Sequence, residues 1–148
     1  AKDNPVLILG MIAALLAAAL HVFIFYIESF AWTTRALSVF GMDRESAEAT
    51  KEMAFNQGFY NFLLAIEACA GIAVYFLASP TVGLALALFG TGSMLAAALL
   101  LFVTCPDKRS AAIKQGALPL IAVAALGVSA LLSQLARSSH PVTLWVSL

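Results

Sequence analysis

Three ionisable side chains stand inside long apolar stretches of this sequence: His21, Glu28 and Glu67. Ionisable groups inside a bilayer are costly, and they usually have a partner or a function. His21 and Glu28 are seven residues apart, close to two helical turns, so they share one helix face. Trp32 extends that face by another turn. An imidazole, a carboxyl group and an indole on one face could bind a small molecule, relay protons or fix helix packing.

Amide and phenol side chains gather at the start of the next apolar stretch, in the segment 56–61, Asn-Gln-Gly-Phe-Tyr-Asn. If the first two helices are antiparallel neighbours, this segment meets Glu28 and can donate hydrogen bonds to it. Gln115 begins the last apolar stretch in a similar way. We therefore predict a polar pocket at the cytoplasmic end of a helix bundle, with these candidate ligand-binding residues: His21, Glu28, Trp32, Asn56, Gln57, Tyr60, Asn61, Glu67 and Gln115.

Three interpretations of these residues stay open. The simplest is a structural hydrogen-bond network, since polar contacts between membrane helices contribute about 0.6–2 kcal/mol each. The others are a ligand pocket and a pathway for protons or ions, and an enzyme is the least favoured interpretation. The chain lacks an HExxH motif, a glycine-rich phosphate loop and a readable nucleophile–base pair. The isolated Cys69 and Cys105 indicate neither a redox pair nor a zinc site. We expect no catalytic residue, no metal and no cofactor.

The composition indicates an integral membrane protein. The chain has 148 residues, 62% hydrophobic and 11% charged, with a mean hydropathy of +0.96. A soluble domain carries about a quarter charged residues. A helix needs about 20 apolar residues to span a bilayer. We predict one all-α domain over residues 1–148, an integral membrane four-helix bundle, with spans at 6–27, 58–78, 82–104 and 116–135 and a short surface helix at about 43–55.

The segment between the first two spans is the only sizeable polar region. Gly41, Met42 and Asp43 predict a turn into the surface helix, with Asp43 as its N-cap. We expect this helix to lie at the cytoplasmic surface and to run on into the second span, and we interpret its charges as a solvated face. At the start of the fourth span, Pro119 is interpreted as a proline compatible with the beginning of a helix.

Small residues recur every four positions in three of the spans. The stripes are Gly10, Ala14 and Ala18 in the first span, Ala65, Cys69 and Ala73 in the second, and Gly83, Ala87 and Thr91 in the third. Such stripes let helix backbones approach closely, so each is most simply a packing seam inside the bundle. The third span carries no charge, and we expect it to face lipid or a partner.

Lys and Arg in short loops predict the topology. The segments 28–57 and 105–115 hold six of the eight basic residues, which places both in the cytoplasm and both termini outside. The span 6–27 is longer than the apolar core of a signal peptide, and we expect it to be retained. The net charge of zero excludes a basic nucleic-acid footprint.

Several motifs resemble a family of small bacterial membrane proteins catalogued as domain of unknown function 1304. They are the face from His21 to Trp32, Glu-Ala-Thr-Lys at 48–51, the segment 56–61 and Gln-Gly-Ala-Leu-Pro at 115–119. The resemblance spans nearly the whole chain and implies a four-helix protein of the bacterial inner membrane. It implies no activity, substrate or cofactor. The segment 101–106 and Glu67 depart from the family pattern.

Two functions follow as hypotheses. The leading one is a non-catalytic accessory or scaffold subunit of a larger membrane complex, which docks or self-associates through its small-residue stripes and uncharged third span. The alternative is a binder or transporter of a small molecule or lipid that uses the polar pocket. In both, the lipid bilayer is a partner.

Overall fold

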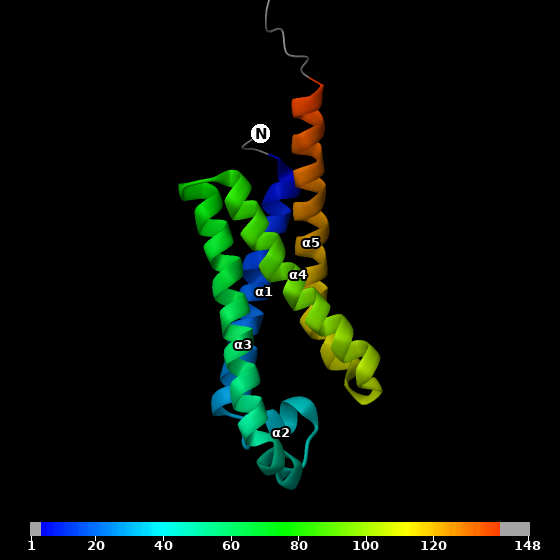
Figure 1. Ribbon diagram of the computed structural model, residues 1–148. Coiled ribbons are helices and arrows are strands. Elements are labelled where there is room, and N and C mark those ends of the chain that lie inside the picture. Colours follow the sequence, from blue (N-terminus) through cyan, green and yellow to red (C-terminus); the bar gives the residue numbers. More distant parts are fainter. Residues whose placement is uncertain (1–3, 140–148) are drawn as a thin grey trace, which may run out of the picture.

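The computed structural model describes residues 4–139, and every regular element in this range is a helix (Figure 1). Four helices are long and apolar enough to cross a membrane, which confirms the predicted all-α four-helix bundle. Two short elements lie in the connections. In chain order the elements are α1 (Pro5–Phe30), α2 (Arg35–Phe40), α3 (Arg44–Leu77), α4 (Pro80–Thr104), the 3-10 turn η1 (Pro106–Lys108) and α5 (Arg109–Ser138).

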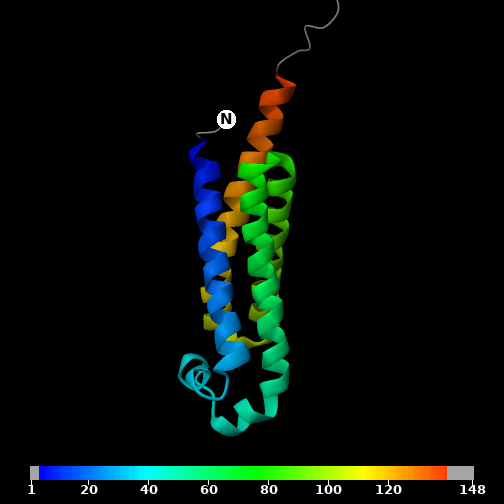
Figure 2. The same cartoon turned by 90° about the vertical axis from the view of Figure 1, so that its left-hand side faces the viewer.

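The four long helices form a ring in which each packs against two neighbours. α1 lies between α3 and α5, and α4 lies between the same two helices on the opposite side. Helices that follow one another in the chain are antiparallel (Figures 1 and 2). The start of α1, the end of α5 and the α3–α4 turn therefore lie at one end of the bundle, and α2 lies at the other.

Two long helices extend beyond their apolar parts. As expected, the predicted surface helix at 43–55 runs on into the span 58–78 as one continuous helix, α3. The last helix begins at Arg109 rather than at 116, so Pro119 lies inside α5 and not in its first turn. Hydropathy detects the apolar part of a helix only, and the polar residues that extend α3 and α5 are compatible with helical backbone.

The predicted turn at 41–43, with Asp43 as the N-cap of α3, is confirmed. Gly41 ends α2 with φ of 63°, a left-handed conformation that glycine adopts without steric cost. The Asp43 side chain then accepts a hydrogen bond from the Ser46 backbone N–H at 2.8 Å. This bond, with a second from the Ser46 hydroxyl, lowers the pKa of the Asp43 carboxyl group.

Glycine and alanine bring α3 and α4 into direct backbone contact. A Cβ on Gly71 would collide with the backbone of Ala87, and a Cβ on Gly83 would collide with the backbone of Tyr75. Gly83, Ala87 and Thr91 are all buried. The stripe of the third span is therefore a seam inside the bundle, and this face of α4 is covered by α3 rather than open to lipid or a partner.

The predicted stripe of the second span is wrong in part. Ala65 is buried, but Cys69 and Ala73 are exposed. The buried small residues of α3 are instead Ala47, Ala54, Gly58, Ala65, Ala68 and Gly71. Because α3 contacts α1 along part of its length and α4 along another part, its buried face does not follow one simple four-residue repeat. The stripe of the first span is confirmed, since Gly10, Ala14 and Ala18 are buried.

Pro119 changes the course of α5. Proline has no backbone N–H and its ring crowds the preceding turn, so a proline inside a helix kinks it. Figure 1 shows the first part of α5 running beside α4 and away from α1 and α3, before the helix turns to pack along α1. The end of the bundle near α2 is consequently formed by α1 and α3. Five phenylalanine rings pack there: Phe25, Phe30, Phe55, Phe59 and Phe62.

We expect Gly83→Ala to destabilise the bundle by about 1–3 kcal/mol, the usual cost of inserting a methyl group into a packed interface. The control is Gly92→Ala on the same helix, because a Cβ at Gly92 meets no atom within 4 Å. Thermal unfolding in a mild detergent, followed by circular dichroism, measures both. Equal melting temperatures for the two variants would contradict close α3–α4 packing.

Candidate functional site

A buried hydrogen bond joins α1 to α3 near the α2 end of the bundle. The Asn61 side-chain amide donates to Glu28 Oε2 at 2.7 Å. Both residues are largely buried, with exposed fractions of 8% for Glu28 and 6% for Asn61. The predicted meeting of Glu28 with the segment 56–61 is therefore present, and its donor is Asn61.

Two further hydrogen bonds hold the end of α1 against α3. The Ser29 hydroxyl donates to the Phe55 carbonyl at 3.0 Å, and a Cβ on Gly58 would collide with the Ser29 oxygen. The Trp32 indole N–H donates to the Thr50 hydroxyl at 3.0 Å. The helices thus approach closely at Gly58 and are joined again nearer the start of α3.

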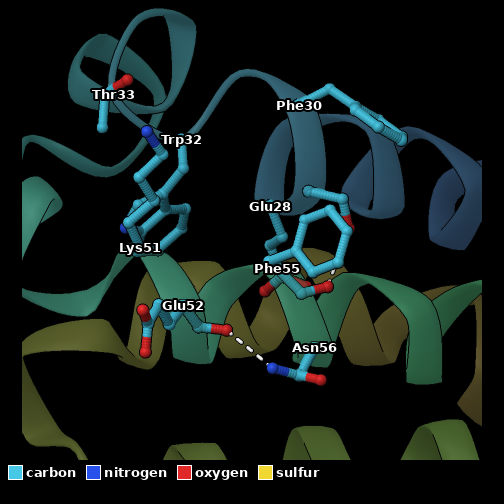
Figure 3. A pocket seen from close by; sticks show the side chains of 9 residues that line it. Glu28, Phe30, Trp32, Thr33, Lys51, Glu52, Phe55 and Asn56 are labelled. Carbon is cyan, nitrogen blue, oxygen red and sulfur yellow. Dashed lines mark hydrogen bonds between the residues drawn. The ribbon is translucent and has the colours of Figure 1, made fainter.

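A cavity of about 550 Å³ lies between these attachments. Its walls come from the last turn of α1, the residues that follow it and the third and fourth turns of α3 (Figure 3). Nine residues line it: Glu28, Ser29, Phe30, Trp32, Thr33, Lys51, Glu52, Phe55 and Asn56. Polar and aromatic groups share the lining, so the cavity suits a molecule with both a polar and an apolar part.

Glu28 lines this cavity, and only one of its two carboxyl oxygens has a hydrogen bond within the described part of the chain. Its Oε2 accepts a hydrogen bond from Asn61. Its Oε1 accepts no hydrogen bond from a described residue and is not fully buried. Since Glu28 lines the cavity, the accessible oxygen is available to a ligand. The other charged groups in the lining are the Lys51 ammonium and the Glu52 carboxylate.

His21 belongs to the interior rather than to the cavity. It is fully buried, and its Nδ1 lies 2.8 Å from the Ala17 carbonyl oxygen. Because a carbonyl oxygen only accepts, the ring proton is on Nδ1 and Nε2 is an acceptor. Nε2 has no hydrogen-bond partner among the described residues. Seven helical residues correspond to about 10 Å of rise, so His21 and Glu28 share a face but not a hydrogen bond.

The structure brings together some of the predicted site residues and separates others. Glu28, Trp32 and Asn56 line the cavity, and Asn61 donates a hydrogen bond to Glu28. Gln57 is exposed, as is Tyr60 at 66%. Neither these two nor the partly buried Glu67 and Gln115 are in the lining: Glu67 is further along α3, and Gln115 is on the part of α5 that diverges with α4.

Sequence reasoning missed Lys51 and Glu52 as cavity residues. Both were interpreted as part of a solvated face, and both side chains are indeed exposed. A signal was present in the spacing, because Glu52 precedes Asn56 by four residues and the two share a helix face. The missing information was that this polar face of α3 lies opposite the end of α1.

From the length of α3 we expect the cavity to lie at the membrane surface. α3 has 34 residues, whereas about 20 suffice to cross the hydrocarbon core. The apolar part of α3 ends at Leu77, near the α3–α4 turn, so we expect the first turns of α3 to project beyond the hydrocarbon. Lys51, Glu52 and Asn56 are in this projecting part, beside the C-terminal end of α1.

No three His, Cys, Asp or Glu side chains within residues 4–139 lie close enough together to hold a metal ion. The cavity lining itself supplies only two carboxyl groups, Glu28 and Glu52. Its chemistry is that of hydrogen bonding, charge and aromatic contact.

A family model described as "Protein of unknown function (DUF1304)" matches residues 15–127, which is most of the chain. The match includes α1 from its third turn, all of α3 and α4, and α5 beyond Pro119. Comparison with curated proteins and with solved structures found no match.

We expect Asn61→Leu to lower the unfolding free energy by about 1–3 kcal/mol, because it leaves the buried Glu28 carboxyl group without its donor. Glu28→Gln is the matched control, since the glutamine side-chain oxygen can still accept from Asn61. Chemical or thermal unfolding in detergent compares the two. A larger loss for Glu28→Gln than for Asn61→Leu would show that the hydrogen bond does not hold α1 and α3 together.

Proposed function

This chain belongs to the DUF1304 family of proteins of unknown function, and we propose that it binds a small amphiphilic molecule in the cavity between α1 and α3. The observation that carries the proposal is the cavity itself, with the accessible oxygen of Glu28 in its wall. Its volume of about 550 Å³ is within the range typical of small-molecule sites.

The composition of the lining favours an amphiphile over a wholly polar solute. Phe30, Trp32 and Phe55 offer aromatic surface, and Glu28, Lys51 and Asn56 offer polar groups. From the length of α3 we also expect the cavity to lie at the depth where lipid headgroups meet the hydrocarbon. A molecule with a polar head and an apolar tail can place the head in the cavity and the tail along the exposed apolar helix surfaces.

The sidedness of the site follows from the basic residues. The cavity is at the end of the bundle that carries the two connections with six of the eight Lys and Arg residues. The positive-inside rule favours placing this end in the cytoplasm and both termini outside. In a bacterial inner membrane, the site would then bind molecules from the cytoplasm or from the inner leaflet.

An accessory subunit of a larger membrane complex, the leading hypothesis from the sequence, becomes the alternative. Its predicted docking surfaces were the small-residue stripes and the uncharged third span, and the stripes of the first and third spans are buried inside the bundle. A partner would therefore have to bind to other surfaces, such as the large exposed apolar side chains of the four long helices. These side chains face lipid in any membrane protein, so the cavity is the more specific feature.

Native mass spectrometry of the protein, extracted from its own membrane in a mild detergent, tests the proposal. We expect a discrete small-molecule mass on the wild-type protein and its loss in Asn56→Trp, whose indole ring fills the cavity. The matched control is Gln57→Trp. Gln57 is the next residue on α3 and is also exposed, but it does not line the cavity.

A bound mass that is retained in Asn56→Trp would overturn this site. A wild-type protein with no small-molecule mass and a stoichiometric larger protein partner would overturn ligand binding in favour of the accessory subunit.

A further inference from the structure

We propose that the group recognised in this cavity is an organic ammonium cation, bound between the free oxygen of Glu28 and the surrounding aromatic rings. This inference rests on the proposed function and specifies its ligand class. It draws on three features of the lining: an incompletely satisfied carboxyl group, three aromatic side chains and a single competing lysine.

The buried position of Glu28 favours a cationic ligand. An ionised carboxylate taken out of water is stable only when it is paired and hydrogen-bonded. Glu28 has one hydrogen bond, from Asn61, and no charged side chain of the described chain interacts with it. A cation that enters the cavity can pair with Oε1 while Asn61 keeps Oε2. Without a ligand, only one of the two Glu28 carboxyl oxygens therefore has a hydrogen-bond partner among the residues that the structure describes.

The aromatic side chains favour an organic cation over a bare metal ion. Phe30 and Phe55 lie edge to face, with ring centroids 6.3 Å apart, and both line the cavity with Trp32. Aromatic faces attract ammonium groups through the negative charge of the ring face, and tryptophan does so most strongly. Alkyl groups on the nitrogen also pack against such rings, whereas a metal ion requires a set of oxygen or nitrogen ligands.

The balance of charge in the lining agrees with a cation. Two carboxyl groups, on Glu28 and Glu52, line the cavity against one ammonium group, on Lys51. The Trp32–Thr50 hydrogen bond anchors the indole on the α3 side of the cavity. The Lys51 ammonium lines the same cavity, so it competes with a ligand ammonium for the carboxylates. Removal of Lys51 should therefore strengthen the binding of a cation and weaken the binding of an anion.

The fluorescence of Trp32 provides a direct readout of this site. The chain has two tryptophans, so Trp145→Phe leaves Trp32 as the only one. The detergent-solubilised Trp145→Phe protein is titrated with three probes that share one alkyl chain: octyltrimethylammonium, octanol and octyl sulfate. We expect a saturable change with octyltrimethylammonium at the lowest concentration.

Three substitutions in this background locate the recognition. We expect Glu28→Gln to weaken octyltrimethylammonium binding about tenfold or more, the loss expected when a hydrogen bond to a charged group is removed. Lys51→Gln should tighten it. Glu48→Gln is the control, because Glu48 is exposed on the same helix but does not line the cavity, and it should change the dissociation constant less than about twofold.

The outcomes separate this inference from the proposed function. If octyl sulfate binds most tightly and Lys51→Gln weakens it, the cavity is an anion site and only the ammonium class is overturned. If no probe binds but Asn56→Trp still removes a co-purifying mass, the ammonium class is again overturned and the cavity remains a ligand site. If no probe binds and no such mass exists, both proposals fail.

The source of the ammonium group is distinguished by choline, which has no alkyl tail. Displacement of octyltrimethylammonium by choline would identify a water-soluble amine as sufficient. Binding that requires the alkyl chain would identify a lipid-like amphiphile.

Discussion

Direct contact between helix backbones is the interaction on which the rest of this structure depends. In lipid the hydrophobic effect does not drive helices together, so close packing at small residues supplies much of the attraction. Gly71 and Gly83 bring α3 and α4 into such contact, and Gly58 brings α3 against α1. α3 therefore takes part in both seams, and its position fixes where the polar residues at its beginning can meet another helix.

The two ends of the bundle differ because α5 changes course at Pro119. At the end with the α3–α4 turn, all four long helices contribute to one core, which includes Leu7 and Met11 of α1 and Leu126 of α5. At the other end, α4 and the first part of α5 diverge from α1 and α3 (Figure 1). The α1–α3 pair is then held by phenylalanine rings and by the Glu28–Asn61 hydrogen bond. A polar bond is strong in this position because water does not compete for it.

The candidate site is a consequence of this arrangement. α3 is longer than the bilayer requires, so its first turns project past the end of α1 and face the residues that follow it. Ser29 and Trp32 join α1 to α3 on either side of the cavity, and Glu28 is held in its wall by Asn61. The interaction that stabilises the helix pair thus also orients the carboxyl group that a ligand would meet. Structural and binding interpretations of Glu28 are compatible for this reason.

The sequence by itself determined the class of structure, since apolar stretches of more than 20 residues can satisfy their backbone hydrogen bonds in a bilayer only as helices. It also determined the Asp43 cap and the stripes of the first and third spans, which depend on neighbouring residues along one helix. The family motifs are likewise short runs of neighbouring residues, and membership of the family is confirmed. Only the tertiary structure decided which polar residues meet. Asn61 rather than Gln57 or Tyr60 bonds to Glu28, and Lys51 and Glu52 join the cavity while Gln115 does not. Helical spacing defines the face a residue occupies, but the crossing of two helices and a kink at one proline define what lies opposite that face.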